Sequence, residues 1–360
     1  MSSFEMIGKL SLIKGNEKFP TYEEKKVGNN GLIKVVRMDM KANGNSHNVK
    51  IEGAFWGEDS LVYTMKKVSD NKYENIKFPY KERDKYIDDV AEFKKYVFVN
   101  GEDRIEFVTQ QELAEFVHKE LQKEEYRGKR FIIKGDIESS EYKNKVYNDF
   151  NITRMYVVND DAKEGEEKLE DKSEGQLDFY ITEGCLDDET FDETRKMFIN
   201  GFIGKYDSKK KADVGIRNVI EVHIPEEKKN AEKLASRIRE NLEIENEDHV
   251  YKLGVKVELI SKSEFVEFDL SMATDEERED LELELITIED LKAQYGCGKG
   301  SFEKKFLFKG WARGYSKGAI EQQLTLAELI NKESSKLEKT NEFEIDEDEN
   351  FDFEDEDYGL

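Results

Sequence analysis

Short apolar segments with period-two alternation recur along the chain and predict a protein built mainly of β-strands. In the first part of the chain, strands are expected at residues 31–41, 47–56, 96–101, 130–139 and 146–158. In the second part, they are expected at residues 178–184, 197–206, 218–224, 252–261, 265–270 and 305–315. Helices are fewer. One follows Thr109 over residues 110–124, with Glu112 in capping-box position, and one begins at Pro225 and continues to residue 242.

Composition divides these elements into two groups. Residues 159–176 are acidic and almost free of large apolar side chains, which predicts a linker. Residues 333–360 are polar and acidic and predict a disordered tail. Residues 1–158 and 177–332 remain as two domains. About five strands with an inserted helix are typical of a Greek-key barrel of the OB type. The predicted fold class is therefore mainly β with inserted helices, in two tandem OB-like barrels, and a β-sandwich is the alternative.

Two eight-residue segments resemble each other. "RFIIKGDI" (130–137) and "KFLFKGWA" (305–312) share a basic residue, three apolar residues, Lys, Gly and a final small or branched apolar residue. A predicted helix precedes each segment, beginning after Thr109 in the first case and after Thr287 in the second. This similarity indicates a duplicated domain, although an echo of this length can also arise by chance.

A net charge of −25 would by itself argue against a nucleic-acid partner, but the negative charge is concentrated in three segments. Residues 341–360 carry a charge of −11, residues 160–174 carry −5 and residues 275–290 carry −8. The remainder of the chain is almost neutral. A polyanionic partner is therefore compatible with the body of the protein.

Several classes of function lack a sequence signature. No apolar run approaches the eighteen residues of a membrane span. Cys185 and Cys297 are far apart and lack metal-site spacing, which favours the reducing cytoplasm. "GCGKGS" (296–301) has the wrong spacing for a phosphate-binding loop, and a turn before a strand is the better interpretation. We expect a cytoplasmic protein without catalytic activity, metal or cofactor.

Basic and aromatic residues alternate in several predicted hairpins. Unpaired nucleic acid needs both, because cations neutralise phosphates and flat rings stack on bases. The ordinary alternative is that the rings face the core and the lysines face solvent. The candidate nucleic-acid-binding residues are Lys34, Arg37, Lys50, Trp56, Arg130, Phe131, Lys134, Tyr142, Lys143, Lys145, Tyr147, Arg154, Lys205, Tyr206, Lys209, Lys210, Lys211, Lys309, Trp311, Arg313, Tyr315 and Lys317.

The last twenty residues, "NEFEIDEDENFDFEDEDYGL", combine eleven acidic residues with four aromatic ones. Solubility alone does not require the aromatic residues. Together with the basic-aromatic hairpins, this ending resembles the single-stranded DNA-binding proteins of bacteria and their bacteriophages. The resemblance implies OB-fold barrels that coat unpaired DNA and a tail that recruits replication or recombination proteins. In this chain that tail would act through Phe351, Phe353, Asp355, Asp357 and Tyr358. The ending "YGL" departs from the Asp-Pro-Phe type of the bacterial proteins.

The sequence therefore predicts a protein that binds single-stranded DNA by backbone electrostatics and base stacking, in DNA replication, recombination or repair. For a bacteriophage protein, the host cytoplasm would be its location. The main alternative is an acidic DNA mimic or protein-interaction factor that binds no nucleic acid. A virion or scaffold component and a nuclease are weaker alternatives. The sequence does not indicate an oligomeric state.

Overall fold

The computed structural model is mainly β, as the apolar pattern predicts. It describes residues 2–28, 31–70, 72–143, 145–159, 169–207, 212–244, 246–264, 273–283, 285–288, 291 and 301–330. The strand predicted at 265–270 and the tail from residue 331 lie outside the described residues. Within the described part of the chain, no helix is long and apolar enough to cross a membrane.

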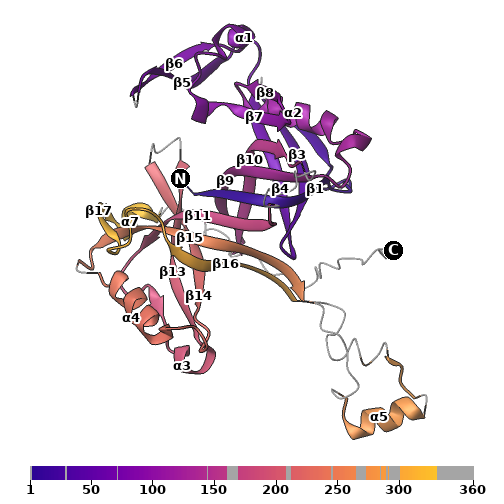
Figure 1. The fold of residues 1–360 in the computed structure, drawn as a ribbon, viewed down its shortest axis with the longest axis vertical. Coiled ribbons are helices and arrows are strands. Elements are labelled where there is room, and N and C mark those ends of the chain that lie inside the picture. The colour runs from indigo at the N-terminus through magenta and orange to yellow at the C-terminus, as the bar shows by residue number, and fades with distance from the viewer. Residues whose placement is uncertain are drawn as a thin grey trace, which may run out of the picture.

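Five strands of the first half of the chain pair in a closed cycle (Figure 1). The strands are β1 (Ser3–Leu12), β3 (Gly31–Ala42), β4 (Asn45–Phe55), β10 (Lys145–Val157) and β9 (Arg130–Tyr142). Each pairs with the next in this order, and β9 pairs again with β1. Only the β4–β10 pair is parallel. Helix α2 (Gln110–Glu120) lies between β4 and β9 in the sequence and packs closely on Gly53 of β4.

The second half repeats this order. Its strands are β11 (Lys172–Ile181), β13 (Lys196–Asp207), β14 (Ala212–His223), β16 (Ser301–Trp311) and β15 (His249–Glu264). They also form a closed cycle of pairings, and the β14–β16 pair is the parallel one. Helix α4 (Ala231–Asn241) lies between β14 and β15. This correspondence supports the predicted duplication. The eight-residue echo is wrong as an alignment, because it pairs the fourth strand of one half, β9, with the fifth strand of the other, β16.

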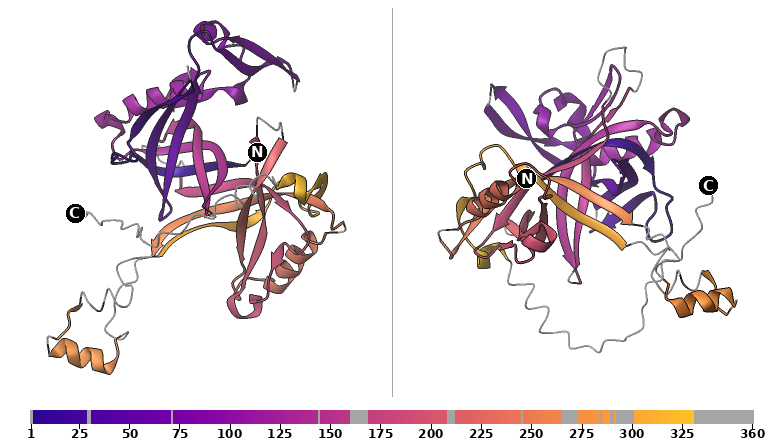
Figure 2. Two further views of the ribbon diagram at one scale, coloured as in Figure 1. Left: turned by 180° about the vertical axis from the view of Figure 1, so that it is seen from behind. Right: turned by 60° about the horizontal axis from the view of Figure 1, so that its bottom comes forward.

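The two halves are joined through their first strands. β1 pairs antiparallel with β11, so that Ser3 lies opposite Gln176 and Ile7 opposite Lys172. One hydrophobic core contains residues of both halves, such as Met6 and Phe131 from the first and Phe179 and Leu253 from the second. The predicted linker is therefore too long, since residues 172–176 already belong to β11. The halves form one continuous sheet (Figure 2).

An insertion distinguishes the first half from the second. Between β4 and α2 it contains β5 (Leu61–Ser69), β6 (Lys72–Pro79), η1 (Tyr80–Glu82), α1 (Arg83–Tyr86), η2 (Glu92–Lys94), β7 (Tyr96–Asn100) and β8 (Asp103–Phe107). In the second half, only residues 224–230 separate β14 from α4. We call residues 57–95 the arm. Figure 1 shows its two strands, β5 and β6, extending away from both halves. Phe78 and Val90 of the arm form a small separate core together with Val108, which precedes α2.

The remaining elements are short. They are β2 (Tyr22–Val27), η3 (Glu124–Tyr126), β12 (Leu186–Asp187), α3 (Phe191–Thr194), α5 (Asp275–Glu282), β17 (Ile320–Thr325) and α7 (Leu326–Leu329). The sequence analysis missed β1, β2, β5, β6, β8, β12 and β17. It also placed the start of α4 too early: the helix begins at Ala231, after Asn230, whose φ of 63° interrupts any helix continuing from Pro225.

Candidate nucleic-acid interface

A groove of about 1360 Å³ lies where the two halves meet. The first half contributes the β1–β2 loop, β3, β4 and the beginning of β10. The second half contributes residues 182–185 and parts of β13, β14, β15 and β16. The second and third strands of each cycle therefore line the same groove. Its walls carry cations, carboxylates, amides and aromatic rings together.

The β1–β2 loop presents Phe19 at the groove from a backbone that hydrogen bonds hold in place. The side-chain oxygen of Asn16 accepts hydrogen bonds from the backbone N–H groups of Lys18 and Phe19, at 3.0 and 2.7 Å. The Thr21 hydroxyl donates to the carbonyl oxygen of Ile13 at 3.0 Å. The Phe19 side chain is nevertheless 53% exposed. An exposed ring on an ordered loop can stack on a base without the cost of ordering the loop.

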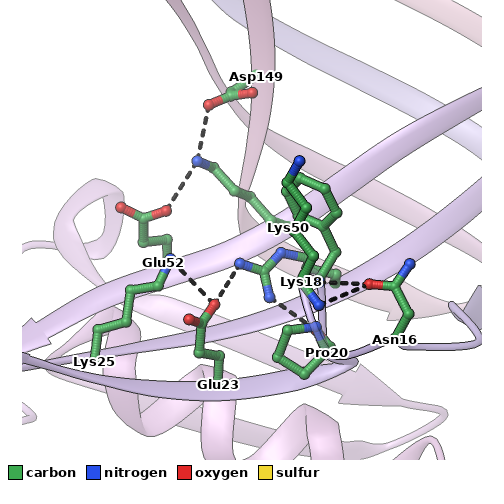
Figure 3. Close-up of polar contacts among 10 residues, drawn as sticks. Asn16, Lys18, Pro20, Glu23, Lys25, Lys50, Glu52 and Asp149 are labelled. Carbon is green, nitrogen blue, oxygen red and sulfur yellow. Dashed lines mark hydrogen bonds and ion pairs between the residues drawn. The ribbon is translucent and has the colours of Figure 1, made fainter. Parts of the chain in front are cut away.

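Arg37 and Lys50 lie side by side on β3 and β4 and are both paired with carboxylates. Figure 3 shows Lys50 between Glu52 and Asp149. The Arg37 guanidinium donates to Glu23 at 2.6 Å and lowers the pKa of that carboxyl. The Lys50 ammonium lies 2.9 Å from Glu52 and 2.8 Å from Asp149. Although burial favours the neutral amine, these two carboxylates raise the pKa of Lys50. A phosphate would therefore have to replace carboxylates at these cations.

The second half places Arg217 and Lys305 in the same groove. Lys305 lies 2.9 Å from Glu221 and 2.6 Å from Glu303. Arg217, on β14, is exposed and has no ion-pair partner within the described part of the chain. Its guanidinium is thus available to a phosphate without displacing a carboxylate.

Polar contacts fix the two halves around the groove. Asn148 of β10 donates to the side-chain oxygen of Asn218 of β14 at 3.1 Å, and the Ser139 hydroxyl donates to Asn148 at 2.6 Å. His47 of β4 lies 2.7 Å from the hydroxyl of Ser173 of β11. Burial, with a further contribution from Lys304, lowers the pKa of His47 to about 4. The neutral imidazole therefore belongs to the folded interface.

Three predicted residues line the groove: Arg37, Lys50 and Tyr147. Two others are wrong as binding residues because the fold uses them internally. Phe131 has no exposed surface and is part of the core. Arg130 is buried and pairs with Asp171 at 2.6 Å. Consecutive residues of a strand point to opposite faces, so the two side chains are buried in different ways. Phe131 faces the core, whereas Arg130 is covered by the segment before β11, through Asp171 and the backbone carbonyl of Leu169.

Other predicted cations are held by neighbours outside the groove. Lys34 pairs with Glu115 of α2, Lys134 with Glu5 and Lys309 with Glu258, while Arg154 donates to the backbone carbonyl of Glu92. Trp311 packs against Phe308 at a centroid distance of 4.8 Å, and Tyr315 covers Gly254. Neither ring lines the groove. Trp311 is the last residue of β16 and Tyr315 follows the strand, whereas the groove is lined by Lys304, Lys305 and Phe306.

The rest lie on the surface or outside the described residues. Trp56, Tyr142, Lys143, Lys145, Lys205, Arg313 and Lys317 are exposed but do not line the groove. The side chain of Tyr206 and all of Lys209, Lys210 and Lys211 lie outside the described residues. The same holds for the five tail residues Phe351, Phe353, Asp355, Asp357 and Tyr358.

Sequence reasoning missed Phe19, Arg217 and Lys305 as groove residues. Phe19 had a detectable signal, because "KGNEKFPTY" places one large ring among turn-forming residues, where no core demands it. Arg217 and Lys305 had none, since each belongs to a strand whose orientation follows only from the pairing.

The chain matches no protein-family model and no curated protein sequence. A functional proposal for this chain therefore rests on the fold and on the residues of the groove.

Proposed function

We propose that each half is an OB-type barrel and that the protein binds single-stranded DNA in the groove between them. An OB-fold is a five-stranded Greek-key barrel. The pairings of both halves fit such a barrel, with the third and fifth strands parallel and a helix between the third and fourth. The position of the groove supports binding. OB-folds bind oligonucleotides on the face of strands two and three and at the loops after strands one and four.

The observation that carries this proposal is that the groove uses those parts. β3 and β4 are strands two and three of the first half, and β13 and β14 are those of the second. The loop with Phe19 follows the first strand, and Tyr147 lies next to the turn after the fourth strand. One single strand could therefore contact the binding faces of both halves.

The chemistry of the groove favours an unpaired strand with little sequence preference. The exposed rings of Phe19 and Tyr147 can stack on any base, at about 1–3 kcal/mol per base. Arg217 can hold a phosphate directly, and Arg37 and Lys50 can do so by exchanging their carboxylates. The protein would act without a catalytic step in replication, recombination or repair, and its acidic aromatic tail would contact partner proteins of those processes.

The test is fluorescence anisotropy of a labelled single strand of about 30 nucleotides over a salt series. Phe19→Ala and Arg217→Ala should each weaken binding about 5- to 150-fold, because each removes a stacking or phosphate contact of about 1–3 kcal/mol. Arg313→Ala, an exposed arginine outside the groove, is the matched control and should bind as the wild type does. Absence of binding by the wild type at low salt would overturn the proposal and favour the acidic protein-interaction factor.

A further inference from the structure

The arm is not needed to build either half. The second half completes the same cycle of strand pairings with only residues 224–230 at the corresponding place. The arm is nevertheless held firmly at its base. The Tyr80 hydroxyl contacts the side chain of Gln111 of α2 at 2.6 Å, Arg83 pairs with Glu112, and the Arg83 guanidinium lies 4.2 Å from the Tyr80 ring. The arm is held in place although the cycle of strand pairings does not require it. We therefore expect it to have a role in binding and not in folding.

The two faces of the β5–β6 ribbon differ in composition. On the inner face, Val62 lies opposite Phe78 and Thr64 opposite Ile76, and Val62, Ile76 and Phe78 pack in the core of the arm. On the outer face, Tyr63 lies opposite Lys77, Met65 opposite Asn75 and Lys67 opposite Tyr73. A tyrosine and a lysine therefore face each other in two cross-strand pairs.

These outer residues are accessible. Tyr63 is 73% exposed, and Leu61 and Tyr73 are also exposed. Phe93 is exposed as well and contacts Tyr73 edge-on at 4.9 Å. Lys67 is paired with Asp70 at 2.8 Å, whereas Lys77 has no ion-pair partner within the described residues. None of the paired outer-face positions is acidic, although acidic residues outnumber basic ones in the chain by 82 to 57. The exposed tyrosines and lysines of this face therefore complement a polyanion whose flat rings can stack on the tyrosines.

In the sequence, Trp56 lies between the groove residues of β4 and the arm. It follows β4 directly and continues the alternation of Lys50 and Glu52, which both line the groove. Its ring covers Gly31, where an added Cβ would lie 2.4 Å from the ring, yet it is 54% exposed. The Trp56 ring packs on Gly31 while much of the ring stays exposed, an arrangement suited to stacking on a base.

We infer that the outer face of the arm extends the single-stranded DNA path beyond the groove. The strand would leave the groove, pass Trp56, and stack on Tyr63 and Tyr73 while Lys67 and Lys77 contact its phosphates. This inference rests on the proposed function and adds a second contact region to it. Because the arm lies outside the groove, only a strand longer than the groove can reach both.

The test compares labelled single strands of about 8 and about 30 nucleotides, because one OB-fold occupies about 4–16 nucleotides and two together up to about 32. Tyr63→Ala with Lys77→Ala should weaken binding of the longer strand about tenfold and leave the shorter strand unaffected. The groove variant Phe19→Ala should weaken both. Lys317→Ala with Ile320→Ala removes an exposed basic and an exposed apolar residue elsewhere and serves as the control. Thermal unfolding of each variant checks that the fold is retained.

The outcomes separate this inference from the proposed function. If the wild type binds neither strand, the proposed function fails and the extended path fails with it. If the wild type binds both and the arm variant binds the longer strand as tightly as the wild type, only the extended path is overturned. Equal weakening of both lengths would also overturn it, because the arm would then act on the groove itself.

Discussion

His47 shows how one residue links the stability of this protein to pH. Its imidazole is buried between β4 and β11, against Ser173, and its pKa is lowered to about 4 by burial and by Lys304. The unfolded chain would bind a proton near pH 6.5. Between pH 6.5 and 4 the unfolded state therefore holds more protons than the folded state, and stability falls as the pH falls.

We expect His47→Gln to flatten this dependence. One such group contributes a slope of up to about 1.4 kcal/mol per pH unit, so the free energy of unfolding of the wild type should fall by that amount per unit below pH 6.5. The measurement is urea unfolding at pH 5, 6 and 7. His223→Gln, at an exposed position, is the control. Carboxylates with lowered pKa, such as Glu221, are common to all three proteins and cancel in the comparison. Equal slopes for wild type and His47→Gln would contradict the assignment.

At the residue scale, the sequence pattern predicted which kinds of side chain a strand carries better than it predicted which face of the strand each side chain lies on. Lys134 and Phe131 are neighbours in a basic-aromatic strand, yet Phe131 lies in the core and Lys134 pairs with Glu5. A strand sequence gives the alternation but not which side faces the core. In addition, most cations of an acidic chain find a carboxylate nearby, and those carboxylates come from distant segments. The partner of Lys50, Asp149, is 99 residues away.

Among the elements, α2 has a clear local origin. Its N-cap Thr109 and Glu112 form the capping box expected from sequence, with the Thr109 N–H donating to Glu112 at 3.1 Å. Glu112 also pairs with Arg83 at the base of the arm. Glu112 therefore both caps the N-terminus of α2 and holds the base of the arm.

Thr109→Ala should destabilise the protein by about 1 kcal/mol, because it removes an N-cap side chain. The measurement is the urea midpoint of unfolding. Thr190→Ala, at the exposed N-cap position of α3, is the matched control, because α3 has no capping box and the Thr190 hydroxyl makes a long contact of 3.3 Å with that of Thr194. It should change the midpoint little. A shift no larger than that of the control would show that Glu112 holds the helix end without the threonine.

Most strands could be predicted because their apolar residues alternate over many positions, as in β3 and β14. The arm strands escaped prediction, since Tyr63, Lys67 and Tyr73 interrupt the apolar alternation with the very residues that face solvent. Pairing could not be predicted either. β9 and β16 read alike, but the chain order of the two halves places them in different positions of the cycle.

For the whole molecule, the shared core predicts that both halves unfold together. Ile133 belongs to the first half and Ile199 to the second, and both are fully buried in the same cluster. Replacing either with Ala should cost about 2–5 kcal/mol and shift one common calorimetric transition. Independent halves would instead give two transitions, and each variant would shift only one of them.

The candidate groove also requires the whole molecule, because both halves contribute residues to it. Phe19, Lys50, Arg217 and Lys305 come from opposite ends of the sequence and meet because β1 pairs with β11. The charge partition left room for cations in the body of the protein, but no local sequence pattern contains this combination of residues.

The pairing of β1 has a consequence for synthesis on the ribosome. β1 is made before all three of its partners, β3, β9 and β11, and the last of these is complete only at Ile181. Such distant contacts form slowly. Until then the apolar side chains of the nascent first strand lack much of their cover, and chaperones that bind exposed apolar segments would have their greatest opportunity during this interval.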